Sequence, residues 1–172
     1  YLLQNIITKR DTEHGFLESG YWLTEQAKSQ MYEHGIATLA LCEAYQMSSD
    51  PSLKEPCQLV VNFICAAQYP RDGGWDYHPR RPGDLSIAGF QVMALKSAVA
   101  CKLEVRAEVL RGIDQFLVTR MVQNGYQFLY RPGGKPTASM TAIGNLVRLF
   151  RGFSHTDPTI RLANNWIAKQ GP

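Results

Sequence analysis

An all-α fold built from about three helical hairpins is predicted for this sequence of 172 residues. Three stretches of similar sequence recur at a spacing of about 53 residues, each at the same phase of a helical segment. They are His34–Leu41, Ala88–Leu95 and Thr141–Arg148. A second helical segment follows each stretch, so one repeat consists of two helices. Repeats of this kind stack side by side, either as an open solenoid or as a ring.

The two helices of a repeat differ in charge. The segments 35–47 and 85–100 each carry one formal charge, Glu43 and Lys96 respectively, whereas 105–120 combines several charges with an apolar face. A helix that is apolar around its whole circumference is surrounded by protein, and a helix with a polar stripe faces water. The predicted inner helices are therefore 35–47, 85–100 and 140–150, and the predicted outer helices are 53–68, 105–120 and 158–169.

Capping residues predict where several of these helices begin. Ser52 and Glu55 have the spacing of a capping box at the start of the first outer helix. Asp157 followed by Pro158 is typical of an N-cap before a proline at the first helical position. The predicted caps of the second and third inner helices are Asp84 and Thr137.

Composition limits the classes of function. With 45% apolar and 19% charged residues the chain is an ordinary globular protein, and its net charge of +3 is too small to argue for nucleic-acid binding. No apolar run approaches the roughly 18 residues that a membrane span requires. Because the chain opens on Tyr1, we expect one domain, 1–172, cut from a longer protein, and the sequence indicates no compartment. Buried free thiols are expected for the cysteines, with disulfides or metal binding as the alternative: Cys42, Cys57, Cys65 and Cys101.

The connections between the repeats also resemble one another. Gly74-Trp75 is echoed by Gly125-Tyr126, and a degenerate third copy is predicted within 15–22. Glycine supplies the turn, and the aromatic side chains are expected to cover the end of a helix pair. The chain is therefore divided into a degenerate part, approximately 1–30, and repeats over approximately 31–75, 76–126 and 127–172.

The first of these connections carries a resemblance to a known family. Its residues are Phe63, Ile64, Gln68, Gly73 and Trp75. In this spacing they resemble the QW-type repeat of squalene and oxidosqualene cyclases, whose helical scaffold protein prenyltransferases share. Looser copies follow over 116–126 and 166–170. The resemblance implies that the hairpins form part of an α/α-toroid, in which the Gln and Trp side chains tie the turn to a helix end.

The resemblance does not extend to the family's catalytic residues. Proton-initiated cyclases carry Asp-x-Asp-Asp-Thr-Ala at the head of an inner helix, and here Asp84 is followed by Ser86 and Ile87 in place of the two later acids. Prenyltransferases of this fold bind zinc through Asp-x-Cys and a later His, and the third inner helix contains no His. We therefore predict no metal and no cofactor, and we interpret Asp84 as an N-cap, with a catalytic role as the alternative.

The remaining candidates are one histidine and a group of loop residues. His34 opens an inner helix, where it is either a core residue or an acid-base or binding group that faces a central cavity. If the repeats stack in phase, their connections share one rim, and a basic, aromatic rim could hold an anionic or sugar-like ligand. Solubility and ordinary turn packing are the alternative. The candidate ligand residues are Trp75, Tyr77, His78, Arg80, Arg81, Tyr126, Tyr130 and Arg131, with Arg71 and Lys135 as further cations.

These observations lead to one function hypothesis and two alternatives. The first is a non-catalytic binding or assembly module, whose inner helices bind an apolar ligand or the rest of a larger protein. The second is an isoprenoid cyclase or prenyltransferase-type enzyme whose acid or metal residues lie outside this chain. The third is a carbohydrate-active α/α-toroid, which would need two acids across a cleft. Because about three hairpins leave apolar helices without neighbours, we also expect self-association or packing against a parent protein.

Overall fold

The computed structural model describes residues 2–6 and 30–170, and these are mostly helical, as the sequence predicts. The degenerate part over 1–30 and the third copy of the connection within 15–22 lie almost entirely outside the described residues. In the described part, the α-helices are α1 Gln30–Ser48, α2 Lys54–Ala67, α3 Leu85–Ala100, α4 Ala107–Arg120, α5 Ala138–Phe150 and α6 Pro158–Ala168. Short 3-10 helices are η1 Leu3–Asn5, η2 Pro51–Leu53 and η3 Gln123–Gly125.

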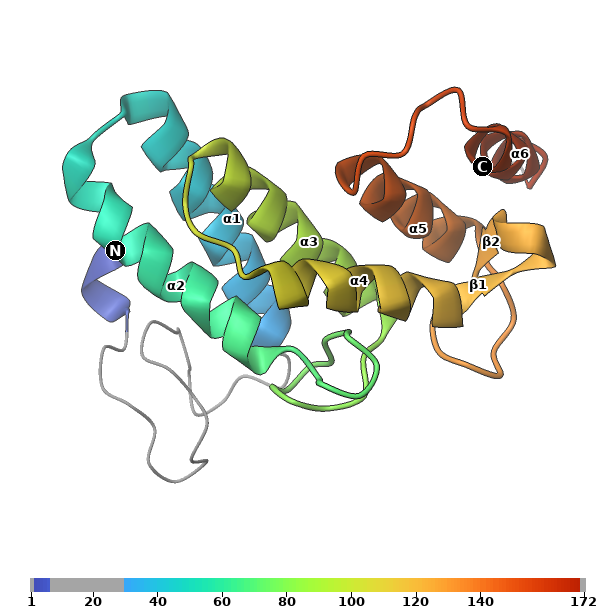
Figure 1. The fold of residues 1–172 in the computed structure, drawn as a ribbon, viewed down its shortest axis with the longest axis horizontal. Helices are drawn as coiled ribbons and strands as arrows, with labels where there is room; N and C mark the ends of the chain where they lie inside the picture. Colours follow the sequence, from blue (N-terminus) through green and yellow to red (C-terminus); the bar gives the residue numbers. More distant parts are fainter. Residues whose placement is uncertain (1, 7–29, 171–172) are drawn as a thin grey trace.

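The helices form two layers. The predicted inner helices α1, α3 and α5 lie side by side, because α1 packs against α3 and α3 packs against α5. In the second layer α2 packs on α1, and α4 crosses in front of α3 toward the strand pair (Figure 1). Helix α6 packs on α5 and is seen nearly end-on in this view. Helices α1 and α2 pack together, as do α5 and α6, so two consecutive pairs along the chain are in contact.

A small strand pair was not predicted. Strands β1 Met121–Val122 and β2 Gln127–Phe128 are antiparallel, with Met121 opposite Phe128. They are joined through η3, where Gln123, Asn124 and Gly125 all have positive φ and so reverse the chain. The sequence predicts only a turn in this segment, because two-residue strands are too short to show an alternating pattern.

Side-chain caps fix the starts of three helices as predicted. Asp84 accepts a hydrogen bond from the Ile87 amide at 2.9 Å, and Thr137 accepts one from the Met140 amide at 3.2 Å. Asp157 accepts from the Thr159 amide at 2.8 Å, with Pro158 at the first helical position. Each cap satisfies a backbone donor that has no partner inside the helix.

The predicted capping box at Ser52 and Glu55 is wrong. The capping residue is Asp50, whose Oδ1 accepts a hydrogen bond from the Ser52 amide at 2.9 Å. Pro51 then starts the single turn η2, and α2 follows directly from it. Asp50 was missed because the turn and the helix were treated as one element that begins at residue 53.

The core lies between the two layers. Its largest fully buried side chains include Trp75, Phe63, Phe116 and Phe128. The predicted polar and apolar faces of α4 are present, with Val109, Ile113 and Leu117 buried and its charged residues exposed apart from Arg120. All four cysteines are free thiols; Cys42, Cys57 and Cys65 are buried and Cys101 is partly exposed. None of the helices in the described residues is both long enough and apolar enough to cross a membrane.

Candidate functional site

The connection after α2 is held together by the two residues that gave the QW resemblance. The Gln68 side-chain amide donates hydrogen bonds to the carbonyl oxygens of Gly73, at 2.8 Å, and Val109, at 3.0 Å. The Trp75 indole donates to the Ile64 carbonyl at 2.8 Å, and the side chain is 1% exposed. Trp75 was also a candidate ligand residue, but its ring is buried in the core, as the resemblance to the QW-type turn implies.

The connection after α4 does not repeat this arrangement. Gln123 is exposed, and Tyr126 is only partly buried. The ring that fills the core here is Phe128, which is fully buried and packs so closely on Gly144 that a Cβ there would lie 2.3 Å from it. The looser copy predicted over 116–126 therefore places the core aromatic two residues further along the chain than expected.

A buried carboxylate, Asp84, is the centre of a hydrogen-bond network at the head of α3. The side chain is fully buried. Its Oδ1 accepts hydrogen bonds from the Ile87 amide and from the Ser86 hydroxyl, at 2.9 and 2.8 Å. Its Oδ2 accepts from the Tyr130 hydroxyl at 3.0 Å, and an Arg131 nitrogen lies 3.6 Å away. The predicted role of Asp84 as an N-cap is confirmed, and the same carboxylate also binds the next connection.

Three tyrosines extend this network. The hydroxyls of Tyr77 and Tyr130 lie 3.2 Å apart, and the Tyr32 hydroxyl donates to the Ser86 hydroxyl at 2.7 Å. The Tyr32 ring meets those of Tyr77 and Phe90 edge to face, with centroids 5.7 and 5.3 Å apart. Burial is the main cause that raises the pKa of Tyr130, so this phenol donates rather than ionises. The tyrosines therefore join α1, α3 and both connections into one unit.

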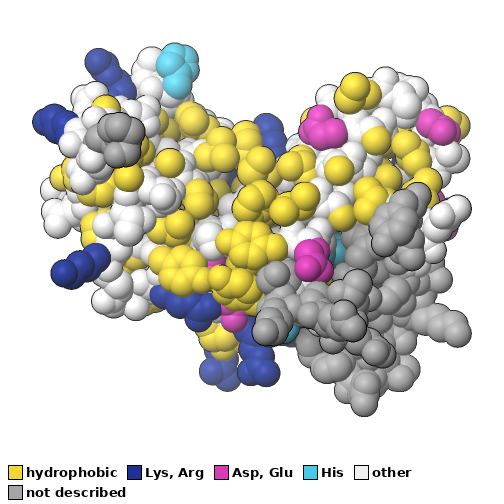
Figure 2. Space-filling view, turned by 180° about the vertical axis from the view of Figure 1, so that it is seen from behind, with side chains coloured by type: hydrophobic (Ala, Val, Ile, Leu, Met, Phe, Trp, Pro, Cys, Tyr) yellow, Lys and Arg dark blue, Asp and Glu magenta, His cyan; other side chains and the backbone are white. Residues whose placement is uncertain are grey.

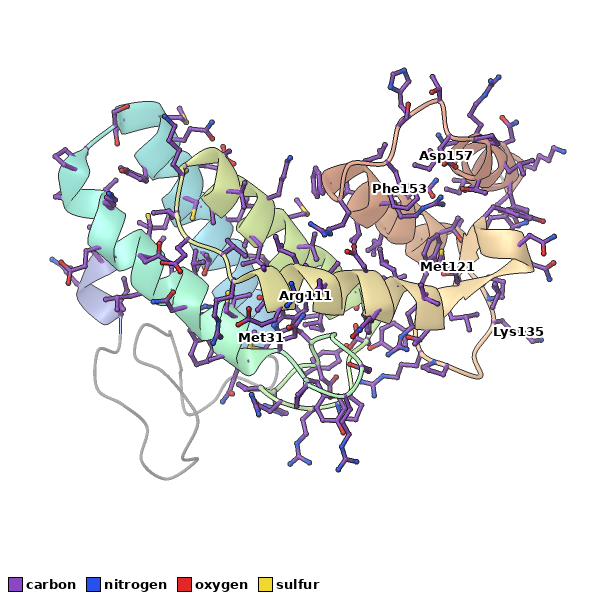
Figure 3. The ribbon with its side chains drawn as sticks, in the orientation of Figure 1. Met31, Arg111, Met121, Lys135, Phe153 and Asp157 are labelled. Carbon is purple, nitrogen blue, oxygen red and sulfur yellow. The ribbon has the colours of Figure 1, made fainter. Side chains whose placement is uncertain are left out.

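Two of the five predicted rim cations, Arg131 and Arg80, are paired with an acid or with backbone, and Arg71 is exposed. Arg131 forms an ion pair with Asp76 at 2.5 Å, beside Asp84. Arg80 donates to the Ala66 carbonyl at 3.2 Å, at the end of α2. Arg81 and His78 are exposed on the same connection, and Lys135 points away from the molecule between β2 and α5 (Figure 3). Of the candidate rim residues, the structure joins Tyr77, Tyr130 and Arg131 by direct contacts, and they enclose an acid rather than an open basic surface.

His34 lies in the core, on the side of α1 that packs against α2. It is fully buried, and its Nε2 lies 3.0 Å from the Val60 carbonyl oxygen. A carbonyl can only accept, so Nε2 carries the proton. Burial lowers the pKa of His34 from its ordinary value of 6.5 to about 4, and the hydrogen bond to Val60 opposes this only in part. The histidine therefore acts as a neutral packing group and does not face a cavity.

The face formed by the inner helices carries exposed apolar side chains. Figure 2 views the molecule from the side opposite α2 and α4 and shows hydrophobic side chains across this face, from its α1 end to its α5 end. Ile36 and Met47 of α1 are 49% and 85% exposed, and Leu149 of α5 is 38% exposed. Residues 35–47 and 140–150 were predicted to be enclosed on most sides, and this surface is the part that remains uncovered.

A shallow pocket of about 270 Å³ lies in the outer layer, between the end of α2 and the first turn of α4. Gln68, Arg80 and Arg106 contribute to its walls. The first two donate hydrogen bonds to backbone carbonyls, and Arg106 lies 3.8 Å from Glu108. Within residues 2–6 and 30–170, no three His, Cys, Asp or Glu side chains are grouped so that they could hold a metal ion.

Comparisons with protein-family models, with curated proteins and with solved structures found no match for this chain. The resemblance to the cyclase and prenyltransferase repeats therefore remains a prediction that rests on the residues quoted above. The geometry of the chain itself must carry any argument about function.

The Asp84 network predicts a large effect of removing one carboxylate. We expect Asp84→Ala to lower the free energy of unfolding by about 2–4 kcal/mol, because the cap is lost and two partly buried hydroxyl donors, those of Ser86 and Tyr130, lose their acceptor. Thr137→Ala is the matched control, since Thr137 caps α5 from an exposed position and should cost about 1 kcal/mol. Urea denaturation of the two variants measures the difference. Equal losses would show that Asp84 acts as a cap alone.

Proposed function

We propose that this chain is a non-catalytic assembly module: an arc of three helical hairpins, of the α/α-toroid kind, that packs through its inner helices against further apolar surface. The single observation that carries the proposal is the exposed apolar face of α1 and α5. Apolar patches larger than a few hundred Å² are uncommon on monomers and mark interaction surfaces. Arrays of helical repeats end in units with a polar outer face, and here the ends carry Ile36, Met47 and Leu149 instead.

The two strongest candidates for chemistry are used for structure. Asp84 is fully buried, and both of its oxygens accept hydrogen bonds that start α3 and hold the next connection. His34 is neutral and enclosed between α1 and α2. A catalytic acid or base must reach the substrate within hydrogen-bond distance, and neither side chain is open to one. This favours assembly over the isoprenoid-enzyme and carbohydrate alternatives.

The test measures the apolar face directly. Leu149→Ser is expected to reduce the fluorescence of a hydrophobic dye bound by dilute protein, because it removes an exposed apolar side chain from this face. Val118→Ser is the matched control, because Val118 is 65% exposed on α4, in the other layer. Sedimentation over a range of concentrations is recorded in parallel, since association would cover the face. A wild-type chain that stays monomeric and binds no dye would contradict the proposed function.

A further inference from the structure

The inner helices pack on one another through a repeated contact. On α1, a Cβ added at Gly35 would lie 2.6 Å from the Gln91 side chain of α3. On α3, a Cβ added at Gly89 would lie 2.7 Å from Ile143 of α5. In both places the earlier helix has no side chain, and the later helix inserts one. Gly35 and Gly89 are 54 residues apart in the sequence. Tyr32 of α1 and Ser86 of α3, whose hydroxyls are hydrogen-bonded, have the same separation.

On α5 the corresponding surface is open. Gly89 is the fifth residue after the N-cap Asp84, and Ala142 is the fifth after the N-cap Thr137. Ala142 is exposed, and Leu146 and Leu149 follow it at helical spacing, with Leu149 38% exposed. We call these three residues the α5 edge. Helix α6 lies on a different side, where Asn145 donates to the Ile160 carbonyl at 3.4 Å.

Helix α1 also has an exposed surface, which corresponds to the side of α3 that packs against α1. The side of α3 that faces α1 runs through Gln91, which donates to the Met31 carbonyl at 2.7 Å, and then through Ala94 and Ala98, both fully buried. These three residues follow Gly89 by two, five and nine positions. The residues that follow Gly35 on α1 by the same numbers of positions are Ala37, Ala40 and Ala44. Ala40 and Ala44 are exposed. We call these three residues the α1 edge.

The two edges are complementary. Ala40 and Ala44 of the α1 edge correspond to Ala94 and Ala98, which α3 buries, and Ala37 stands in place of Gln91. Ala142 of the α5 edge corresponds to Gly89, the position on which a following inner helix packs. Leucines on one helix and alanines on the other let two helices approach closely, with ridges in a groove. Each described end of the array therefore lacks the partner that the other end could supply.

We propose that the chain associates head to tail, with the α5 edge of one copy docked on the α1 edge of a second copy. The proposal rests on the proposed function and names the partner: another copy of this chain. The contact continues the α1–α3 and α3–α5 contacts across a chain boundary. Because the two edges differ, the interface is heterologous, so association either closes into a ring or continues as a filament.

Complementary variants test the proposal. Ala40→Glu blocks the α1 edge, and Leu149→Glu blocks the α5 edge; both replace exposed helical residues, so the fold should be retained, as circular dichroism would check. Val118→Glu on α4 is the control. In sedimentation velocity at micromolar concentration, the wild type and the control are expected to associate. Each edge variant alone should associate at least about tenfold more weakly. An equimolar mixture of the two variants should form a one-to-one complex, because each retains the edge that the other has lost.

Other outcomes are decisive as well. If Ala40→Glu associates normally and Leu149→Glu does not, the contact is a symmetric one between two α5 edges, and the proposal is overturned. A wild-type monomer that still binds hydrophobic dye would overturn it too, while leaving an assembly surface for a different protein. A monomer that binds no dye would remove both proposals. If either Glu variant unfolds, mixed Ala40→Cys and Leu149→Cys chains give a second measurement: an oxidative cross-link dependent on both new thiols is expected, and its absence contradicts the docking.

Discussion

Replacing Trp75 by Ala is expected to lower the free energy of unfolding by about 3–5 kcal/mol. The ring is 1% exposed and is among the largest side chains in the core. Its loss would leave a cavity where the connection after α2 crosses beneath α4, and it would leave the Ile64 carbonyl without the indole donor at 2.8 Å. Surrounding atoms cannot refill this space easily, because Gly74 and Gly83 already lie in close contact with the Phe116 ring.

Two other variants separate the causes. Trp75→Phe keeps most of the apolar volume and removes the hydrogen bond, so it should cost about 1–2 kcal/mol. Trp166→Ala removes an indole from α6 that is only partly buried, and its cost should lie clearly below that of Trp75→Ala. Thermal and urea denaturation give the free energies. Unchanged stability in Trp75→Ala would mean that the indole is open to solvent, as the ligand hypothesis for this residue requires.

Sequence alone predicted the helices and their order because that information is local. The period of apolar residues, the caps at Asp84, Thr137 and Asp157, and the glycine at each connection act over a few positions. The spacing of about 53 residues predicted which helices belong together. The errors also have local causes. Asp50 was missed because one turn precedes α2. Phe128 was missed because Tyr126, which follows a glycine as Trp75 does, was aligned with Trp75, although Phe128 lies 53 residues after Trp75, at the repeat spacing.

The candidate site was predicted less well, because charge pairing is a property of the folded chain. Arg131 was interpreted as a free cation, yet Asp76 lies 55 positions earlier and neutralises it. Tyr32 and Ser86 were not predicted as site residues, although their separation of 54 residues is the repeat spacing. Pairing each polar residue with its counterpart one repeat away would have found Tyr32 with Ser86 and Tyr77 with Tyr130. No such rule finds Arg120, which reaches Asp72 and the Gly83 carbonyl from the end of α4.

The neutral, enclosed state of His34 makes the fold sensitive to acid. The pKa of His34 is about 4 in the folded chain and 6.5 for an ordinary, exposed imidazole, so between these values the unfolded chain binds a proton that the folded chain excludes. The contribution of neutral His34 to the free energy of unfolding is then fully present above about pH 6.5 and decreases as the pH falls toward 4. At about 1.4 kcal/mol for each pKa unit, the loss from this residue approaches roughly 3 kcal/mol.

His34→Gln isolates this contribution. The Gln amide can still donate to the Val60 carbonyl but does not titrate in this range. The difference in unfolding free energy between the wild type and His34→Gln should therefore be constant above about pH 6.5 and should change in favour of the variant below it. Carboxylates that titrate in acid contribute equally to both proteins and cancel in the difference. His155→Gln, at an exposed position after α5, controls for the loss of a histidine as such. Parallel curves for wild type and His34→Gln down to pH 4.5 would show that the imidazole accepts a proton in the folded chain, and that water reaches it between α1 and α2.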